Sequence, residues 1–390
     1  MSVSSGNRIE SQLLRKINER RLLDVIQHKG PLSRAAIARV SGLTAPTVSK
    51  AVDSLLKHGF IEEIDPPEQL RGRPGKLVRM AVESAAVIGI SIDTHVCCVV
   101  SAGLDGGVTE ARTRRFVTPS TYDALIDDLE SRCRELLDDI PGRMHGIGVC
   151  APGLVNERLG EIVFCPNLHL LDKRNPARDL ETRLGMKAVL LQETDGLCLS
   201  EWMYGVARSL NDFALLDVSI GLGMGVMCSG RLLGGRSGMA GELGHITVNP
   251  DGVRCGCGNH GCLETLATDT ALVRLISEKD GISRSLNEVA TALDERPSAY
   301  EQEVRTTSEY LAIAIAAAIN ICNPTMLFVH GTLLVANEER FARVLELVKN
   351  RTLTASLAEC TIVPTKSSKR QAAIAGIMHH LTSDWAPAIP

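Results

Sequence analysis

Residues 241–264 read GELGHITVNPDGVRCGCGNHGCLE and form the most specific pattern in the chain. Within them Cys255, Cys257 and Cys262 fall inside eight residues and are separated by glycines. Such a tight loop can wrap three thiolates around one tetrahedral ion, because glycine allows the backbone angles that sharp turns require. The spacing therefore predicts a metal site built around these cysteines.

The fourth ligand of such a site is open on spacing alone, since His245 and His260 are both candidates. Four protein ligands would close the site and leave no position for an activated water. We therefore expect a structural Zn²⁺ that ties the loop to the element bearing the histidine, and not a catalytic ion. The alternative is a set of free core cysteines, which the glycine-separated spacing in a cytosolic chain disfavours.

The composition indicates a globular protein of roughly two or three domains. The chain has 390 residues, of which 44% are hydrophobic and 23% charged. No apolar run approaches the roughly 18 residues of a membrane span, so we expect no membrane insertion. The amino terminus, MSVSSGNRIE, lacks the basic and apolar regions of a signal peptide. We therefore expect a cytoplasmic protein whose twelve cysteines are thiols or metal ligands.

Charge is distributed unevenly along the chain. Residues 1–80 contain 14 Lys and Arg against 8 Asp and Glu, a balance of +6, whereas the whole chain carries −4. A basic amino-terminal module on an acidic body suits contact with a polyanion such as DNA. Uneven surface charge without a partner explains the same numbers equally well.

The amino-terminal segment contains the pattern of a helix-turn-helix. Ser33 can cap a short helix that Gly42 stops, and Thr44 can cap the next, with Pro46 in its first turn. The second helix has an apolar stripe at Val48, Val52, Leu55 and Leu56. This arrangement offers the second helix to the DNA major groove.

The residues predicted to face DNA lie on this second helix and on the basic loop that follows. Thr47, Ser49, Lys50 and Ser54 are left mostly outward by the apolar stripe, and Thr44 precedes them; of these we take Thr44, Thr47, Ser49 and Lys50 as DNA contacts. Residues 59–64 and 77–80 then predict two strands of a wing whose tip spans residues 71–76. Arg71 and Arg73 at this tip could enter a minor groove or grip phosphates. The alternative is a small helical bundle whose basic loop is only solvated.

From about residue 86 onward, strands and helices alternate in two cycles, which predicts an α/β body of two halves with a sheet each. The expected strands are 86–93, 96–102, 146–150, 188–191, 213–218 and 326–330, and the expected helices are 122–137, 195–207, 306–321 and 338–352.

Two places in this body could handle phosphate or sugar. The turn Ser219-Ile-Gly221-Leu-Gly223 follows a strand and offers backbone N–H groups to phosphates, although glycine-rich hairpins are common. Asp195 follows the strand at 188–191 and could act as a general base on a sugar hydroxyl. A simple helix-capping role for Asp195 is equally compatible with the sequence.

The order of these motifs resembles the ROK family, which contains transcriptional repressors and sugar kinases. The likeness runs across nearly the whole chain and is most specific in GELGH and CxCGxxGCLE. Among the members of the family, the chain resembles the repressors of the Mlc, NagC and xylose-repressor type, because the bacterial kinases usually lack the DNA-binding extension. The resemblance implies a winged helix-turn-helix domain over residues 1–82. A two-lobed ribonuclease-H-like sugar-kinase fold, of the actin and hexokinase type, would follow over 83–390.

The resemblance also implies roles for single residues. Zn²⁺ would be held by His245, Cys255, Cys257 and Cys262, in a loop over residues 245–262. A sugar would lie between the two lobes, bound by Asn167, Asp195, Glu242, His245 and Glu264. Carboxylates and an imidazole offer the fixed donors and acceptors that a ring of hydroxyls demands.

The chain departs from the kinase pattern where ATP would bind. ROK kinases carry D-x-G-G-T after the first strand, and this chain has Ser91-Ile-Asp93-Thr94-His95 there. An added carboxylate repels a triphosphate, and the lost glycines prevent close backbone approach. The adenosine Gly-Gly of the family is replaced by Gly331-Thr332. We therefore expect no enzyme activity; the alternative is an ATP-dependent sugar kinase with an added DNA-binding domain, in which Asp195 is the base.

These observations predict a sugar-responsive transcriptional repressor of carbohydrate uptake or catabolism genes. The expected partners are a double-stranded DNA operator, a small sugar or sugar phosphate, and a second copy of the chain in a homodimer or homotetramer. A sugar-transporter component is a further expected partner by family resemblance. The sequence names neither the sugar nor the operator.

Overall fold

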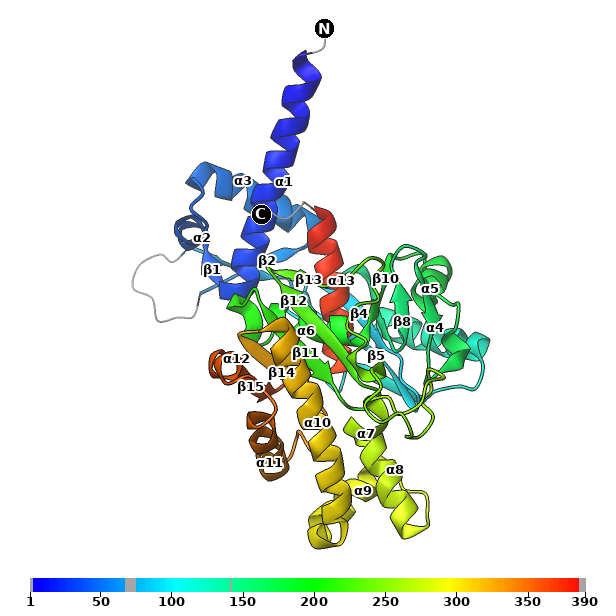
Figure 1. The fold of residues 1–390 in the computed structure, drawn as a ribbon. Helices are drawn as coiled ribbons and strands as arrows, with labels where there is room; N and C mark the ends of the chain where they lie inside the picture. Colours follow the sequence, from blue (N-terminus) through cyan, green and yellow to red (C-terminus); the bar gives the residue numbers. More distant parts are fainter. Residues whose placement is uncertain (1–2, 67–74, 141, 386–390) are drawn as a thin grey trace. The chain divides into compact units, whose positions relative to one another are not determined.

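The computed structural model describes residues 3–66, 75–140 and 142–385 (Figure 1). The chain forms two compact units. Unit 1 comprises Met1–Pro152, Arg174–Arg208 and Ser368–Pro390, and unit 2 comprises Gly153–Lys173 and Ser209–Ser367. The chain therefore leaves unit 1 and returns to it twice.

The amino-terminal part of unit 1 is a winged helix-turn-helix, here called the head. Its elements are α1 (Val3–Lys29), β1 (Leu32–Ser33), α2 (Arg34–Ser41), α3 (Ala45–His58), β2 (Ile61–Ile64) and β3 (Leu77–Met80), and the strands form a sheet in the order β1-β3-β2. The Ser33 hydroxyl accepts a hydrogen bond from the Ala36 N–H and caps α2, while Gly42 ends that helix with φ of 69°. Both predicted boundaries of this helix are confirmed.

The core of the head follows the predicted apolar stripe with one exception. Val48, Val52 and Leu55 on α3 are fully buried. Ser54, predicted to face outward, is also buried, because Arg15 on α1 reaches over it and donates a hydrogen bond to its hydroxyl at 2.8 Å. The outward prediction for Ser54 was wrong, since the sequence does not show that α1 packs against this face of α3.

The rest of unit 1 is built on a five-stranded sheet in the order β10-β7-β4-β5-β6. β4 pairs antiparallel with β5 and parallel with β7, so the sheet is mixed. Its elements are β4 (Ala85–Ser91), β5 (Val96–Ala102), β6 (Thr113–Val117), α4 (Tyr122–Asp138), β7 (Arg143–Ala151), α5 (Pro176–Leu184), β10 (Ala188–Gln192), α6 (Glu193–Met203), η2 (Val206–Ser209) and α13 (Lys369–Trp385).

The carboxy-terminal helix α13 completes this lobe by packing on β4 and β7. Figure 1 shows α13 beside β4. Two glycines make the approach possible. A Cβ on Gly148 would lie 1.9 Å from the Ala373 carbonyl oxygen, and a Cβ on Gly89 would lie 2.8 Å from the Ile374 side chain. The helix backbone therefore rests directly on the sheet, more than 200 residues later in the chain.

Unit 2 contains a second five-stranded sheet in the order β13-β12-β11-β14-β15. Its core joins this sheet to the long helix α10, whose Leu311, Ile315 and Ile319 are fully buried. The elements are β8 (Leu154–Asn156), β9 (Glu161–Phe164), η1 (His169–Leu171), β11 (Phe213–Asp217), β12 (Gly223–Cys228), β13 (Arg231–Leu232), η3 (Leu243–His245), α7 (Glu264–Ala267), α8 (Asp269–Asp280), α9 (Leu286–Glu295), η4 (Pro297–Tyr300), α10 (Glu301–Cys322), β14 (Met326–His330), α11 (Glu338–Lys349), α12 (Thr354–Glu359) and β15 (Thr361–Pro364).

The two sheets repeat one topology. In each sheet, the first three strands along the chain are paired antiparallel with one another. The fourth strand pairs parallel with the first strand, on its other edge, and the fifth strand pairs parallel with the fourth. The fold is thus a winged helix-turn-helix followed by two α/β lobes with one sheet each, as predicted, and both sheets are mixed. None of the helices in the described part of the chain is long and apolar enough to cross a membrane.

Candidate functional site

The cysteine loop of unit 2 brings together four potential metal ligands. His245, at the end of η3, and Cys255, Cys257 and Cys262 each place one ligand atom within 4.8 Å of all the others. The Cys257 and Cys262 sulfurs are 3.7 Å apart, and the Cys255 sulfur lies 3.7 Å from His245 Nδ1. Two ligands at about 2.3 Å from a tetrahedral ion are separated by about 3.8 Å, so these distances fit a zinc-sized tetrahedral site.

The structure distinguishes the two histidines that are candidates for the fourth metal ligand. His260 is exposed, and its Nδ1 contacts the Gly252 carbonyl oxygen at 3.3 Å. His245 instead joins the cluster, because the N–H of Leu263 bonds to the Ile246 carbonyl and holds η3 beside the cysteines. Burial raises the pKa of the Cys255 thiol, so a bound cation is the natural means of keeping this sulfur as a thiolate.

Carboxylates surround this cluster in unit 2. Glu242 Oε2 lies 3.6 Å from His245 Nε2, the ring nitrogen that faces away from Cys255. Glu264, at the start of α7, has Oε1 3.7 Å from the Cys255 sulfur, and its Oε2 accepts a hydrogen bond from the Leu222 N–H at 3.0 Å. The imidazole and both carboxylates are thereby oriented around the same loop, as outer partners of a metal site commonly are.

Asn167 also belongs to this neighbourhood. A Cβ on Gly221 would lie 2.8 Å from Glu264 Oε2 and 3.6 Å from the Asn167 side-chain nitrogen. Four of the five predicted sugar-binding residues, Asn167, Glu242, His245 and Glu264, are therefore in unit 2. The fifth, Asp195, is in unit 1 and is the third residue of α6, whose N-cap is Gln192. Asp195 therefore lies in the first turn of the helix and is not its N-cap.

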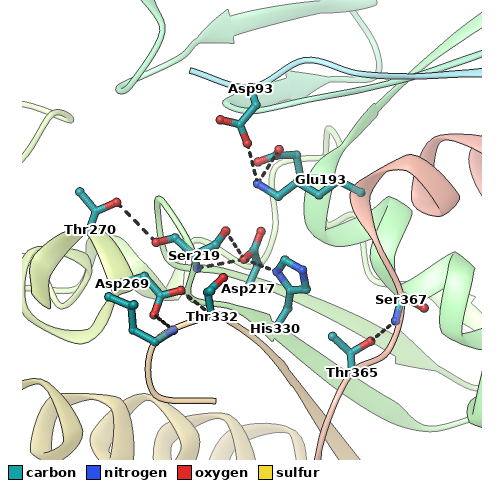
Figure 2. Close-up of polar contacts among 12 residues, drawn as sticks. Asp93, Glu193, Asp217, Ser219, Asp269, Thr270, His330, Thr332, Thr365 and Ser367 are labelled. Atoms are coloured by element: carbon teal, nitrogen blue, oxygen red, sulfur yellow. Dashed lines mark hydrogen bonds and ion pairs between the residues drawn. The ribbon is translucent and has the colours of Figure 1, made fainter. Parts of the chain in front are cut away.

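The turn after β4 in unit 1 is held by an ion-pair network that no sequence motif indicated. Lys369, the first residue of α13, lies 2.8 Å from Glu193 Oε1 and 3.4 Å from Asp93 Oδ2. Figure 2 labels the two carboxylates, Asp93 and Glu193, of this network. The Lys369 side chain is only 12% exposed. Because Asp93 and Lys369 are 276 residues apart, no local pattern could have revealed this contact.

The corresponding turn of unit 2, after β11, is also bonded to a carboxylate. Asp217 Oδ1 accepts hydrogen bonds from the Ser219 N–H and hydroxyl and contacts His330 Nδ1 at 2.9 Å (Figure 2). The glycine-rich stretch is the loop of the β11–β12 hairpin. The Ser219 and Leu222 N–H groups therefore already have acceptors within this unit.

The predicted DNA-contacting residues lie around the start of α3. Thr44 is its N-cap residue but makes no side-chain cap; its hydroxyl bonds to that of Thr47 at 2.9 Å. Lys50 is exposed, whereas Thr47 and Ser49 are half-buried. Arg34 pairs with Asp53 and Glu63 and so connects α2, α3 and the wing. Arg71 and Arg73 lie outside the described residues.

Comparison with known proteins identifies both parts of the chain. The model of the ROK family matches residues 87–382. The chain belongs to the ROK family. The model of the MarR family matches residues 16–72, which cover most of the head of this ROK protein. Together these matches identify a ROK-family transcriptional regulator with a MarR-type helix-turn-helix.

Several relatives match most of the chain. The DNA-binding transcriptional dual regulator NagC of Escherichia coli K12 is 26% identical over 92% of this chain and 91% of its own length. The xylose repressor of Bacillus subtilis is 25% identical over 83% of this chain and 84% of its own. A crystal structure of a ROK family transcriptional regulator, a homologue of the Escherichia coli MLC protein, has a TM-score of 0.78. It is 24% identical and covers 95% of this chain and 97% of that one, so the fold of head and body is shared.

Proposed function

We propose that this chain is a sugar-responsive, cytoplasmic repressor of carbohydrate uptake or catabolism genes. The observation that carries the proposal is the union of a MarR-type head and a ROK body in one chain. Relatives that match over more than nine-tenths of this chain bear the names of an N-acetylglucosamine repressor and a xylose repressor. In this proposal residues 1–82 bind the operator and residues 83–390 bind the effector.

Operator binding is assigned to α3 and the wing. Thr44, Thr47, Ser49 and Lys50 would contact the major groove, and Arg71 and Arg73 would contact phosphates or the minor groove. The exposure of Lys50 and the Thr44–Thr47 hydroxyl pair support this assignment. A homodimer or homotetramer would present two such helices about one DNA turn apart.

Effector binding is assigned to Asn167, Asp195, Glu242, His245 and Glu264, with a sugar or sugar phosphate as ligand. The packing of Glu242 and Glu264 around the cysteine loop supports this assignment in unit 2. The ion held by His245, Cys255, Cys257 and Cys262 would be Zn²⁺, in a closed and structural site. His245 would then present Nδ1 to the metal and Nε2 toward Glu242 and the sugar.

Sugar phosphorylation is not part of the proposal. Near the turn after β4, the Lys369 ammonium group is already paired with the Asp93 and Glu193 carboxylates, which a phosphate would have to displace. In unit 2 the Asp217 carboxylate occupies the Ser219 N–H and hydroxyl, groups that a phosphate would otherwise use. An assay of ADP release with hexoses, amino sugars and pentoses tests this directly. Turnover that Asp195→Asn abolishes would establish the kinase instead.

The test of operator binding is selection of duplexes from a random library by the full chain, followed by binding titrations at fixed salt. We expect one enriched, near-palindromic sequence and a loss of at least about tenfold in affinity for Lys50→Gln. Lys349→Gln, which removes an exposed lysine from α11, is the matched control and should bind as wild type does. Absence of any enriched sequence would contradict the proposal. A pull-down with sugar-transporter components in the same format tests that further partner.

A further inference from the structure

A basic pocket lies inside unit 1, where the head meets the first lobe. Its volume is about 320 Å³. The head contributes Lys16 on α1, His58 at the end of α3, and Phe60 between α3 and β2. The lobe contributes residues of β7, the residue before β10, and residues of α13: Arg143, His145, Lys187, His380 and Leu381. Six of the eight lining residues are lysine, arginine or histidine, and none is acidic.

Direct contacts hold the two sides of the pocket together. The Arg143 guanidinium donates a hydrogen bond to the His58 carbonyl oxygen at 3.4 Å. His145 Nε2 donates to the Gly59 carbonyl oxygen at 3.1 Å, and its ring packs against Phe60 with centroids 4.9 Å apart. The pocket is therefore formed by the docking of the head on β7.

The charges of the pocket are only partly balanced by the protein. Lys187 has Glu181 as a neighbour at 3.8 Å, whereas Lys16 and Arg143 have no ion pair among those found in the described residues. Burial lowers the pKa of His145, and the charge of Arg143 lowers it further. A site in which one cation disfavours another is stabilised by an added anion.

The donors match one class of ligand. Lysine ammonium groups, a guanidinium and imidazole N–H groups are the donors that proteins use for phosphate, which offers several acceptor oxygens at once. The volume also leaves room for more than the phosphate alone. A carboxylate of similar size offers only two acceptor oxygens to the Lys16, Arg143 and Lys187 side chains, whereas a phosphate group offers three.

We propose that this pocket binds a phosphate group, free or on a small metabolite, and thereby fixes the head against the first lobe. Such a ligand binds only while Lys16 and His58 face Arg143 and Lys187, so it favours the docked head over any other arrangement. The site is separate from the sugar site and does not rest on sugar recognition by unit 2.

The experiment uses the full chain and titrates inorganic phosphate against chloride at equal ionic strength. Thermal unfolding and ³¹P NMR line width are the two readouts. We expect a saturable rise in Tm with phosphate, and at least about fivefold weaker binding for Lys16→Gln and for Arg143→Gln. Both side chains are exposed, so neither change should unfold the protein. The control, Lys57→Gln, removes an exposed lysine from the same helix as His58 and should bind as wild type does.

Further arms separate the sources of phosphate and can overturn the proposal. Glucosamine 6-phosphate should bind more weakly in Lys16→Gln if its phosphate uses this pocket. If it loses binding only in Glu264→Gln, its phosphate is recognised elsewhere and free phosphate is the ligand of the pocket. Equal effects of phosphate and chloride, or wild-type phosphate binding in both pocket variants, would disprove the site. The site would also be disproved if Lys16→Gln changed the binding of duplex DNA and left the binding of phosphate unchanged.

Discussion

The sheets of units 1 and 2 have the same strand order, but the turns and loops attached to them differ. After β4, the first strand of the five-stranded sheet of unit 1, Asp93 pairs with Lys369 on α13, 276 residues later in the chain. After β11, the first strand of the unit 2 sheet, Asp217 instead bonds to Ser219 in the same turn and to His330 on the neighbouring strand β14. Among the described residues, the four-ligand cluster belongs to unit 2 alone.

The strands of the two sheets set the fold, whereas the turns and loops attached to them differ between the units. The strand order follows from buried apolar strands, and β4 and β11 are buried along their whole length. The turns after these strands are free to carry different side chains without changing the sheet. The head and the metal loop are therefore additions to a repeated scaffold, and they can be tested one at a time.

The largest effect should come from the metal loop. Cys257→Ser removes one ligand and should abolish stoichiometric zinc, because a closed structural site needs all four. We expect loss of several kcal/mol from unit 2, with little change in the unfolding of unit 1. Metal analysis and calorimetry measure both. Cys228→Ser, an exposed cysteine on β12 of the same unit, should change neither quantity. If Cys257→Ser has the stability and the zinc content of wild type, the proposed metal site is wrong.

The next effect concerns the turn of unit 1. Lys369→Met leaves Asp93 and Glu193 without their shared cation in a largely buried place, which should cost about 3 kcal/mol. Adding Glu193→Gln should restore part of the loss, since one buried charge is then removed. Chemical denaturation measures the free energy of unfolding of wild type, of Lys369→Met and of the double variant. The exposed Lys366→Met is the control. Equal stability of Lys369→Met and wild type would show that the network does not hold the turn.

A third change tests the packing of α13 on the sheet. Gly148→Ala places a methyl group against the Ala373 carbonyl, so either the helix or the strand must move. We expect a loss of about 1–3 kcal/mol in unit 1 only. Gly75→Ala, where the added Cβ meets no atom within 4 Å, is the matched change and should be neutral. A neutral Gly148→Ala would contradict the close helix-to-sheet approach.

The smallest effect is a difference in pH response between the units. Burial raises the pKa of Asp269 in unit 2 to about 6 and lowers that of His379 in unit 1 to about 4. The raised carboxyl contributes stability below its unfolded pKa near 3.8, which is lost as the pH rises through about 6. The depressed imidazole contributes stability above its unfolded pKa near 6.5, which is lost as the pH falls through about 4.

Acidification from pH 7 to 5 should therefore act on the units in opposite directions. Through Asp269 it should stabilise unit 2, and through His379 destabilise unit 1, by about 1–2 kcal/mol each. Calorimetry of Asp269→Asn and His379→Phe at both values measures each contribution as a difference from wild type. If either variant has the wild-type pH response, that group is not the source.

Sequence alone predicted the architecture and the metal loop but not the contacts between distant segments. Gly42 and Ser33 were sufficient to bound α2 because capping is local. The choice between His245 and His260 required the packing of η3 beside the cysteine loop. The burial of Ser54 and the pairing of Lys369 depend on helices that lie far away in sequence, so no periodicity reveals them.

The most direct measurement of the central claim is the affinity of the full chain for its selected operator across a panel of free and phosphorylated sugars. One sugar class should change the wild-type Kd by about tenfold or more. Glu264→Gln keeps an acceptor for the Leu222 N–H, and it should bind the operator normally but respond to that sugar by less than about twofold. Glu359→Gln, an exposed position on α12, should respond as wild type does. An operator complex that responds to all sugars equally, to none, or identically in Glu264→Gln would contradict the account.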